Sequence, residues 1–183
     1  MRFVASRNSL DIVPRMHTVD DSSLRTKTLT WHDPLPSLGE AATLSGLEYM
    51  RKLVAGELPP PPIAVLLGMT VAEVGEGRAV FEAEPGEHHY NPIGSVHGGF
   101  AATLLDSALG CAVHTTLPAG VGYTTLDLQV RYARGISVDT GTVRCEARVL
   151  HSGRRSAIAE AELTAVATGK LLAHGTTTCA ILG

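Results

Sequence analysis

The segment HGGFAATLLDSALGCAVHTTL, residues 97–117, decides the fold of this chain. Its length and composition predict a helix from His97 to about Thr116. Apolar side chains occupy nearly every face of that helix, so it has to be enclosed by other elements and cannot lie on a surface. A curved sheet wrapped around this single buried helix is the most economical enclosure.

The strands for such a sheet lie on both sides of the helix in the sequence. TVAEVGEGRAVFEAE, residues 70–84, indicates two strands joined by a hairpin turn at residues 75–77. Four alternating runs follow the helix, namely TTLDLQVRY, GTVRCEARVL, SAIAEAELTAV and KLLAHGTTTCAIL. In the first run, the alternation puts Leu126, Leu128, Val130 and Tyr132 on one face. The predicted order is β-β-α-β-β-β-β, an α+β fold of six mainly antiparallel strands around one helix.

The composition is that of one folded domain. The 183 residues are 44% apolar and 18% charged, which excludes a generally disordered chain. A net charge of −3 and an aromatic content of 4% argue against a dedicated nucleic-acid binder. Cys111, Cys145 and Cys179 show no CxxC spacing. We expect them to be buried free thiols in a reducing compartment.

The N-terminal part differs from the rest of the chain. Residues 1–38 are polar and aperiodic, and are predicted to form a flexible or draped extension. Residues 39–62 are predicted to hold one accessory helix, over residues 39–56, and a proline-rich linker. Residues 63–183 then form the main domain. The sequence has no convincing signal peptide and no apolar run of about 20 residues, so we expect a cytoplasmic protein.

Two features of the central helix indicate chemistry. Its first N–H groups lack intrahelical partners, and Gly98 and Gly99 let a ligand approach them, as an oxyanion hole requires. The alternative is that these glycines only allow tight packing of helix and sheet. Asp106 lies in the middle of the same apolar helix, where a carboxylate is costly unless it is hydrogen-bonded or faces a cavity. It is a candidate general base, or else a structural residue bonded to the backbone or to Ser107.

The spacing of these two features favours a dimer. Gly98 and Asp106 are eight residues apart, which is about 12 Å along a helix axis. One ester or thioester carbonyl cannot easily contact both positions on one helix. Two antiparallel helices across a two-fold axis would bring Gly98 of each chain close to Asp106 of the other.

Residues 91–99, NPIGSVHGG, followed by Asp106, match the pattern N-P-x-G-x-V-H-G-G…D. With this motif the chain resembles the hotdog-fold acyl-CoA thioesterases, most closely the phenylacetate-pathway (PaaI-like) family. The segment ATGKLLAHGTTT, residues 167–178, is similar to that family's last hairpin, and the likeness covers residues 63–182. The resemblance implies a hotdog fold and hydrolysis of acyl-CoA without a cofactor. It also implies a homodimer as the minimal active unit and a homotetramer as the assembly.

The resemblance also implies roles for residues at the start of the helix. Asn91 helps to place the attacking water or the thioester. Gly98 offers its N–H to the thioester carbonyl, and Gly99 lies beside the substrate. His97 orients its neighbours and does not transfer a proton.

The resemblance further implies that a carboxylate and a hydroxyl come from the other subunit of the dimer. Asp106 is the carboxylate that activates water or attacks the thioester directly. Thr125 carries the hydroxyl that binds the lytic water, with Thr124 as a competing assignment. Arg131, Arg134 and Arg154 are candidates for contacts with the CoA phosphates, although each also fits a solvated surface arginine.

Other clusters point to less favoured functions. His88, His89 and His97 suggest a metal site, but no Asp, Glu or Cys follows at ligand spacing, so we expect no metal. The chain has no GxSxG motif, and Ser95 and Ser107 have no base nearby in sequence, which argues against a Ser-His-Asp hydrolase.

Two alternatives share the fold itself. A hotdog hydratase or dehydratase would need a His that works with a carboxylate, a pattern this chain lacks. A non-catalytic acyl-CoA sensor would be expected to carry a helix-turn-helix or to lack the carboxylate. The single helix predicted over residues 39–56, together with Asp106, argues against it. The acyl group itself is not determined by the sequence.

Overall fold

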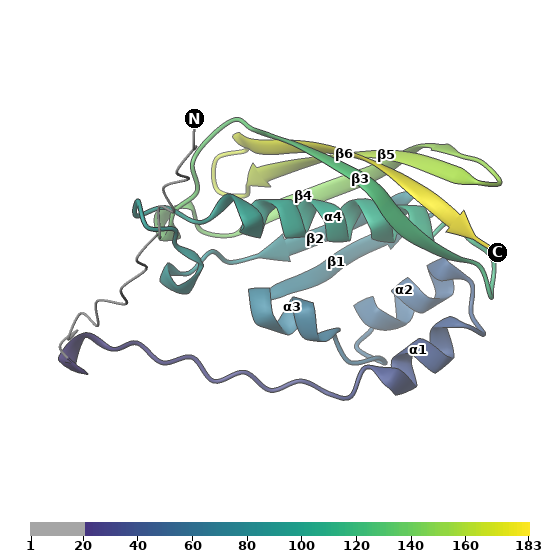
Figure 1. Cartoon of the computed structure of the whole chain (residues 1–183), viewed down its shortest axis with the longest axis horizontal. Coiled ribbons are helices and arrows are strands. Elements are labelled where there is room, and N and C mark those ends of the chain that lie inside the picture. The colour runs from purple at the N-terminus through teal and green to yellow at the C-terminus, as the bar shows by residue number, and fades with distance from the viewer. Residues whose placement is uncertain (1–20) are drawn as a thin grey trace, which may run out of the picture.

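The buried helix predicted from residues 97–117 is α4 (Gly98–His114), and it lies in the hollow of a curved six-stranded sheet (Figure 1). The computed structural model describes residues 21–183. The strands are β1 (Met69–Gly75), β2 (Arg78–Ala83), β3 (Gly122–Tyr132), β4 (Val143–Ser152), β5 (Ser156–Ala165) and β6 (Leu171–Leu182). The shorter helices are α1 (Leu35–Ala41), α2 (Gly46–Val54) and α3 (Pro62–Leu67), with 3-10 turns at Asp21–Ser23, Glu87–His89 and Val138–Thr140.

The sheet has the order β1-β2-β4-β5-β6-β3, and all its neighbours are antiparallel. The predicted hotdog fold and its β-β-α-β-β-β-β order are therefore confirmed. The hairpin between β1 and β2 turns at Gly77, whose φ of 68° lies in the left-handed region that glycine tolerates. β1 and β3 form the two edges of the sheet.

The core forms where α4 packs against small side chains of the sheet. Leu104, Leu105 and Leu109 of α4 are fully buried against strands rich in alanine. At Gly175 in β6, an added Cβ would come within 3.3 Å of the Leu105 methyl groups, so glycine lets the helix approach without displacing the leucine side chain. The Ala- and Val-rich composition is thus explained by a sheet drawn tightly around one helix.

A β-bulge in β3 changes the face that the sequence pattern predicted for one residue. The register with β6 shifts between Thr125 and Asp127, which leaves Leu126 as the extra residue. Leu126 is 64% exposed, so it does not share the inner face with Leu128 and Val130 as the alternation predicted. Because the bulge reverses the alternation, Thr125 faces α4 and Thr124 faces solvent.

The accessory region also differs from the prediction. Residues 39–56 do not form one helix, because α1 ends at Ala41 and α2 begins after Ser45. Ser45 caps α2 in a capping box with Glu48, which defines a new helix start. α2 packs against the C-terminal end of α4, where Gly46 N–H donates to the Leu117 carbonyl at 3.0 Å.

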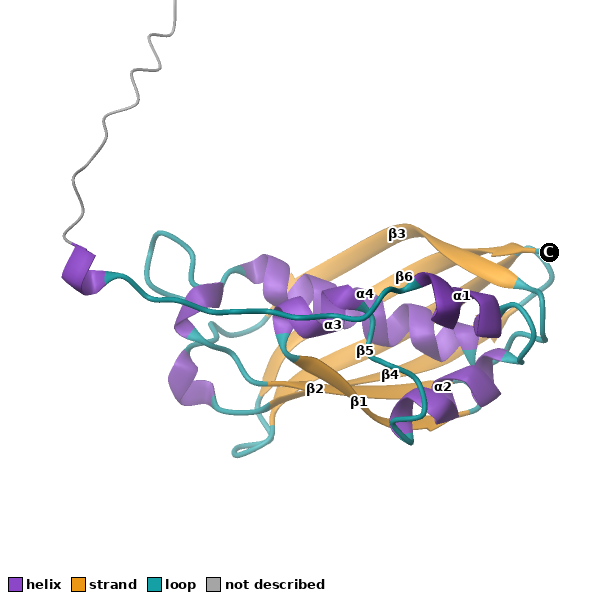
Figure 2. Ribbon diagram, turned by 90° about the horizontal axis from the view of Figure 1, so that it is seen from below, coloured by secondary structure: helices purple, strands orange, loops and turns teal. Residues whose placement is uncertain are grey.

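The segment before α1 runs extended along the side of the molecule that carries α3 (Figure 2). It is tied to the loop before α4 by Arg25–Glu87 at 3.0 Å and by Lys27 Nζ donating to His88 Nε2 at 2.6 Å. The part of the predicted extension in residues 1–20 lies outside the described residues. None of the helices in residues 21–183 has the length and apolar character needed to cross a membrane.

Candidate active site

The loop that leads into α4 is organised by Asn91. Its Oδ1 accepts hydrogen bonds from Ile93 N–H at 3.0 Å and Ser95 N–H at 3.2 Å, and its Nδ2 donates to Ser95 Oγ at 3.0 Å. This Asx-type turn fixes the conformation of residues 91–95. Within this chain, the Asn91 side-chain amide therefore stabilises the loop that leads into the first residue of α4.

His97 is the N-cap of α4, and its side-chain hydrogen bond determines which backbone N–H at the helix start remains unpaired. Its Nδ1 accepts the Gly99 N–H at 2.8 Å, so the Gly99 amide is already bonded. Among the described residues, no acceptor is found for the Gly98 N–H. The first residue of α4 thus presents an unpaired donor at the positive end of a 17-residue helix.

A pocket of about 300 Å³ lies beside this helix start. Gly98, Tyr132 and Arg134 are among the residues that line it. The Tyr132 hydroxyl donates to the Gly98 carbonyl at 3.0 Å, and a Cβ on Gly98 would lie 3.1 Å from that hydroxyl oxygen. The guanidinium of Arg134 donates to the Leu171 carbonyl at 2.7 Å and places a positive charge beside the pocket.

Asp106 is half-buried on α4 and has one defined side-chain partner. The Thr125 hydroxyl donates to its Oδ1 at 3.0 Å. The β3 bulge decides this pairing, since it turns Thr125 and not Thr124 toward the helix. The carboxylate is therefore hydrogen-bonded and also open to solvent on the outward side of α4.

A second and larger cavity, of about 720 Å³, has Asp106 in its wall. Ser107, Cys111 and Tyr123 surround the carboxylate there. Burial raises the pKa of the Cys111 thiol to about 12 and raises the pKa of the Tyr123 hydroxyl well above its usual value. Both groups are therefore uncharged at neutral pH, and Asp106 is the only carboxylate among the lining residues of this cavity.

The candidate residues Gly98 and Asp106 lie in different places of one chain. Gly98 lines the smaller pocket and Asp106 the larger one, and their eight-residue separation is about 12 Å along α4. Arg131 is exposed on β3 near the Gly98 end of the helix. Arg154 lies in the β4–β5 turn at the opposite end, next to the contact of 3.1 Å between the Ser152 and Thr116 hydroxyls.

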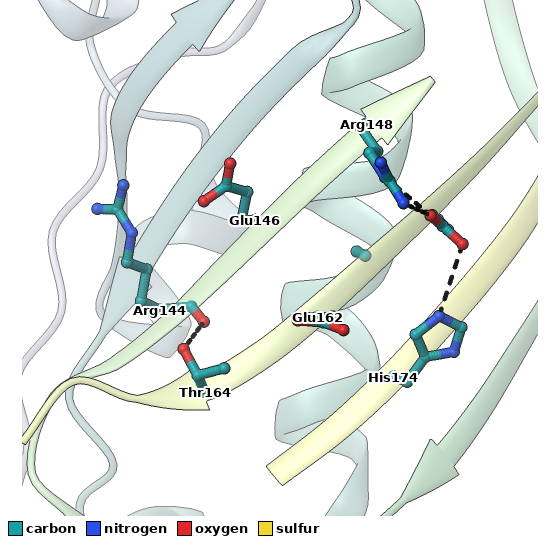
Figure 3. Close-up of a pocket in the computed structure, with 8 residues that line it drawn as sticks. Arg144, Glu146, Arg148, Glu162, Thr164 and His174 are labelled. Atoms are coloured by element: carbon teal, nitrogen blue, oxygen red, sulfur yellow. Dashed lines mark hydrogen bonds and ion pairs between the residues drawn. The ribbon is translucent and has the colours of Figure 1, made fainter. Parts of the chain in front are cut away.

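The outer face of the sheet carries another hollow, and most of the charged side chains that line it form ion pairs, among them Arg148 with Glu160 (Figure 3). Arg144 contacts Glu82 at 2.8 Å and Glu73 at 2.5 Å, and Arg148 pairs with Glu160. His174 lies 3.9 Å from Glu160. Such exposed pairs are typical of a solvated sheet surface.

The histidines before α4 do not assemble into a metal site. Lys27 bonds to the ring of His88, and the buried ring of His89 packs on Phe100 with a centroid distance of 4.6 Å. Within residues 21–183 no three His, Cys, Asp or Glu side chains gather in a ligand arrangement.

Apart from Ser107, which the sequence had offered as a possible partner, the surroundings of Asp106 were missed by sequence reasoning. Ser107 and Cys111 lie on its side of α4, and Tyr132 contacts Gly98 from β3. Ser107 and Cys111 are four residues apart, so helical spacing could have placed them together on one side of the helix beside Asp106. No sequence signal connects Asp106 with the residues of α2 and α3 across the larger cavity.

Comparisons with known proteins agree on the family. The profile of the thioesterase superfamily matches residues 93–171. Human acyl-coenzyme A thioesterase 13 is 33% identical over 111 residues, which are 61% of this chain and 78% of that protein. A variant of the phenylacetic acid degradation protein PaaI from Thermus thermophilus is 30% identical with a TM-score of 0.59, covering 66% of this chain and 98% of that one.

The PaaI protein from the E. coli phenylacetic acid degradation operon shares the fold, with a TM-score of 0.65 at 22% identity over 77% of this chain and 97% of that one. The relative at 33% identity and the superfamily match carry the assignment of the family. The six-stranded antiparallel sheet around one central helix agrees with this family. The chain belongs to the thioesterase superfamily, as a PaaI-like hotdog protein, and is a thioester hydrolase.

Proposed function

We propose that this protein hydrolyses acyl-CoA to the free acid and CoA, with Asp106 as the essential carboxylate. The observation that carries the proposal is the hydrogen bond from Thr125 to Asp106 at the wall of a large, mainly apolar cavity. A carboxylate is costly in such surroundings, and a functional role explains why it is present. The printed name of the human relative, an acyl-coenzyme A thioesterase, supports CoA as the leaving group.

The mechanism follows from the chemistry of three groups. The Gly98 N–H donates to the thioester oxygen and stabilises the negative charge that develops there. Asp106 takes a proton from a water held by Thr125, the water oxygen bonds to the carbonyl carbon, and the C–S bond breaks to release CoA thiolate. In the alternative route, the Asp106 carboxylate attacks first and water then hydrolyses the resulting anhydride. Both routes use the same residues.

A dimer completes this site in the proposal. One chain offers Gly98 and Asp106 about 12 Å apart along a helix, too far for one carbonyl to contact both. β3 pairs only with β6 and leaves an 11-residue edge free among the described residues. Such an edge is a template for pairing with a second chain, and antiparallel β3–β3 pairing would place the two α4 helices side by side. Pairing of two such dimers into a homotetramer remains a prediction from the resemblance.

The same arrangement would collect positive charge for the CoA phosphates. Arg134 and Arg131 lie near the N-terminal end of α4. Antiparallel helices would bring the C-terminal end of the other subunit's α4, where Arg154 lies, next to this end. We propose these arginines as the phosphate contacts, with Gly99 and Asn91 shaping the backbone beneath the thioester.

The proposal is tested by a hydrolysis screen of aryl, short-chain and long-chain acyl-CoAs, with Asp106→Ala as the control. We expect turnover of at least one class by the wild-type protein and a loss of about 10²- to 10⁴-fold in the variant. Far-UV circular dichroism and thermal unfolding should show that the variant remains folded. A folded Asp106→Ala protein with the wild-type rate would remove Asp106 from the mechanism. If wild type and variant are equally inactive on every thioester but bind acyl-CoA, a non-catalytic binding function is indicated.

A further inference from the structure

The cavity beside Asp106 is built mainly by the region before the part of the chain that matches the family profile. α2, the linker of residues 59–61, α3, β1 and β2 supply most of its walls. All of these residues precede residue 93, where the superfamily match begins. In Figure 1 α2 and α3 lie below α4, on the side away from the middle of the sheet. In the wall opposite Asp106, α2 and the linker therefore come from the accessory region, and α3, β1 and β2 come from the start of the main domain.

We propose that this cavity is the acyl pocket, and that α2, the linker and α3 select an uncharged aliphatic acyl chain of medium or greater length. The inference rests on the proposed thioesterase function, because it places the acyl carbonyl at Asp106. From that end, the chain would extend between Leu53 and Val54 of α2 and Ile63 of α3, toward Val71 of β1.

The charge distribution favours an uncharged acyl group. Leu53, Val54, Ile63 and other apolar side chains form the far wall, and the cavity is lined by neither lysine nor arginine. Cys111 and Tyr123, at the end near Asp106, are kept neutral by burial. A dicarboxylic acyl group would bring a second carboxylate into these surroundings, where the His32 imidazole is the one basic side chain and no lysine or arginine is available to pair with it, which is costly.

The volume of the cavity and the exposed apolar side chains of its wall favour a long acyl chain over a small acyl group. The cavity volume of about 720 Å³ lies within the range of pockets that hold a whole drug-sized ligand, so an acetyl group would leave most of it empty. Ile63 and Val54 are 44% and 42% exposed in the single chain. An aliphatic chain that covers them removes apolar surface from water, which is the main source of affinity for such a ligand.

α3 offers a matched pair of positions for the test. Ile63 lines the cavity, whereas Leu66 on the same helix is similarly exposed, at 51%, and does not line it. We expect Ile63→Trp, which fills the pocket, to lower kcat/KM for decanoyl-CoA by about tenfold or more while butyryl-CoA hydrolysis stays near wild type. Ile63→Asp should have the same selective effect, because a bound acyl chain would then remove the new carboxylate from water, which costs free energy. Leu66→Trp and Leu66→Asp should leave both substrates unaffected.

A binding measurement separates this inference from the proposed function. Titration calorimetry with free decanoate should show binding to the wild-type protein and about tenfold weaker binding to Ile63→Trp, independent of any turnover. Decanoate binding of this kind without hydrolysis of any acyl-CoA would support the pocket and overturn the thioesterase proposal. If acyl-CoA is hydrolysed but the Ile63 and Leu66 variants share the wild-type chain-length profile, the pocket is wrongly placed. A wild-type preference for acetyl- or phenylacetyl-CoA over decanoyl-CoA would overturn the aliphatic class.

Discussion

Polar side chains have different surroundings on the two faces of the sheet. On the face that holds α4 they stand singly among apolar groups: Asp106 has the Thr125 hydroxyl as its partner, and His89 is buried with Nε2 unbonded among the described residues. On the outer face, Arg78 and Arg144 each bridge two glutamates. The same types of charged group are thus isolated on one side and mutually neutralised on the other.

This difference separates reactive groups from solvated ones. An exposed ion pair gains little, because water and salt screen it, and its loss is tolerated. An isolated polar group in apolar surroundings costs free energy in every folded molecule, so its presence is best explained by a use. The outer-face hollow of Figure 3 contains more charged side chains than the wall around Asp106, but most of them are already in ion pairs.

Among the substitutions that test this comparison of the two faces, the largest effect on turnover is expected at the bulge in β3. Thr125→Ala removes the one side-chain hydrogen bond that Asp106 accepts within residues 21–183, and we expect kcat to fall about 10- to 100-fold, as for loss of a hydrogen bond to a charged group. Thr124→Ala, one residue away and exposed on the opposite face, should retain wild-type kcat. Steady-state kinetics on the best acyl-CoA of the screen measure both.

Thr125→Ser is the informative control, since it keeps the hydroxyl and loses only a methyl group. It should restore most of the activity lost in Thr125→Ala. If Thr124→Ala were impaired and Thr125→Ala active, the assignment of the functional hydroxyl to Thr125 would be wrong.

The sequence predicted the strands because each repeats a two-residue alternation, and it predicted α4 because residues 97–117 are long and apolar enough for a buried helix. The bulge at Leu126 inserts one residue without altering composition, so periodicity could not decide between Thr124 and Thr125. The break between α1 and α2 was readable in Ser45 and Glu48, a capping box that the longer apolar spacing obscured.

The candidate site was predictable only in part. The motif around Gly98 and the position of Asp106 were evident, because glycines at a helix start and a carboxylate in an apolar helix are local anomalies. The cavity was not, since the side chains of α2 and α3 that face Asp106 come from a region more than 40 residues earlier in the chain. Only tertiary packing brings these segments together.

A smaller, pH-dependent effect is expected at His89. Gly86 N–H donates to its Nδ1 at 3.0 Å, and burial, with the nearby charges of His88 and Lys27, lowers its pKa to about 4. Between this value and an unfolded pKa of about 6.5, the unfolded chain binds more protons than the folded one. The contribution of His89 to stability is therefore present at neutral pH and is lost as the pH falls from about 6.5 toward 4.

Urea unfolding at pH 7, 6, 5 and 4.5 tests this expectation. His89→Asn keeps an acceptor for Gly86 but cannot titrate, so its free energy of unfolding should fall less steeply with acid than that of wild type. The exposed His151→Gln variant should follow the wild-type curve. Parallel curves for wild type and His89→Asn would mean that the buried ring does not resist protonation.

The smallest effect is expected on the outer face, where the comparison predicts tolerance. Arg144→Gln breaks its contacts with Glu82 and Glu73 on a partly exposed surface, and we expect the free energy of unfolding to fall by about 1 kcal/mol or less. The difference from wild type should shrink further in 1 M NaCl, where the screening length is about 3 Å, and acyl-CoA turnover should stay unchanged. Since Arg144 lies across the sheet from α4, a large loss of turnover with intact stability would show that the paired face takes part in the reaction. The contrast between isolated and paired groups would then fail as a guide to function in this fold.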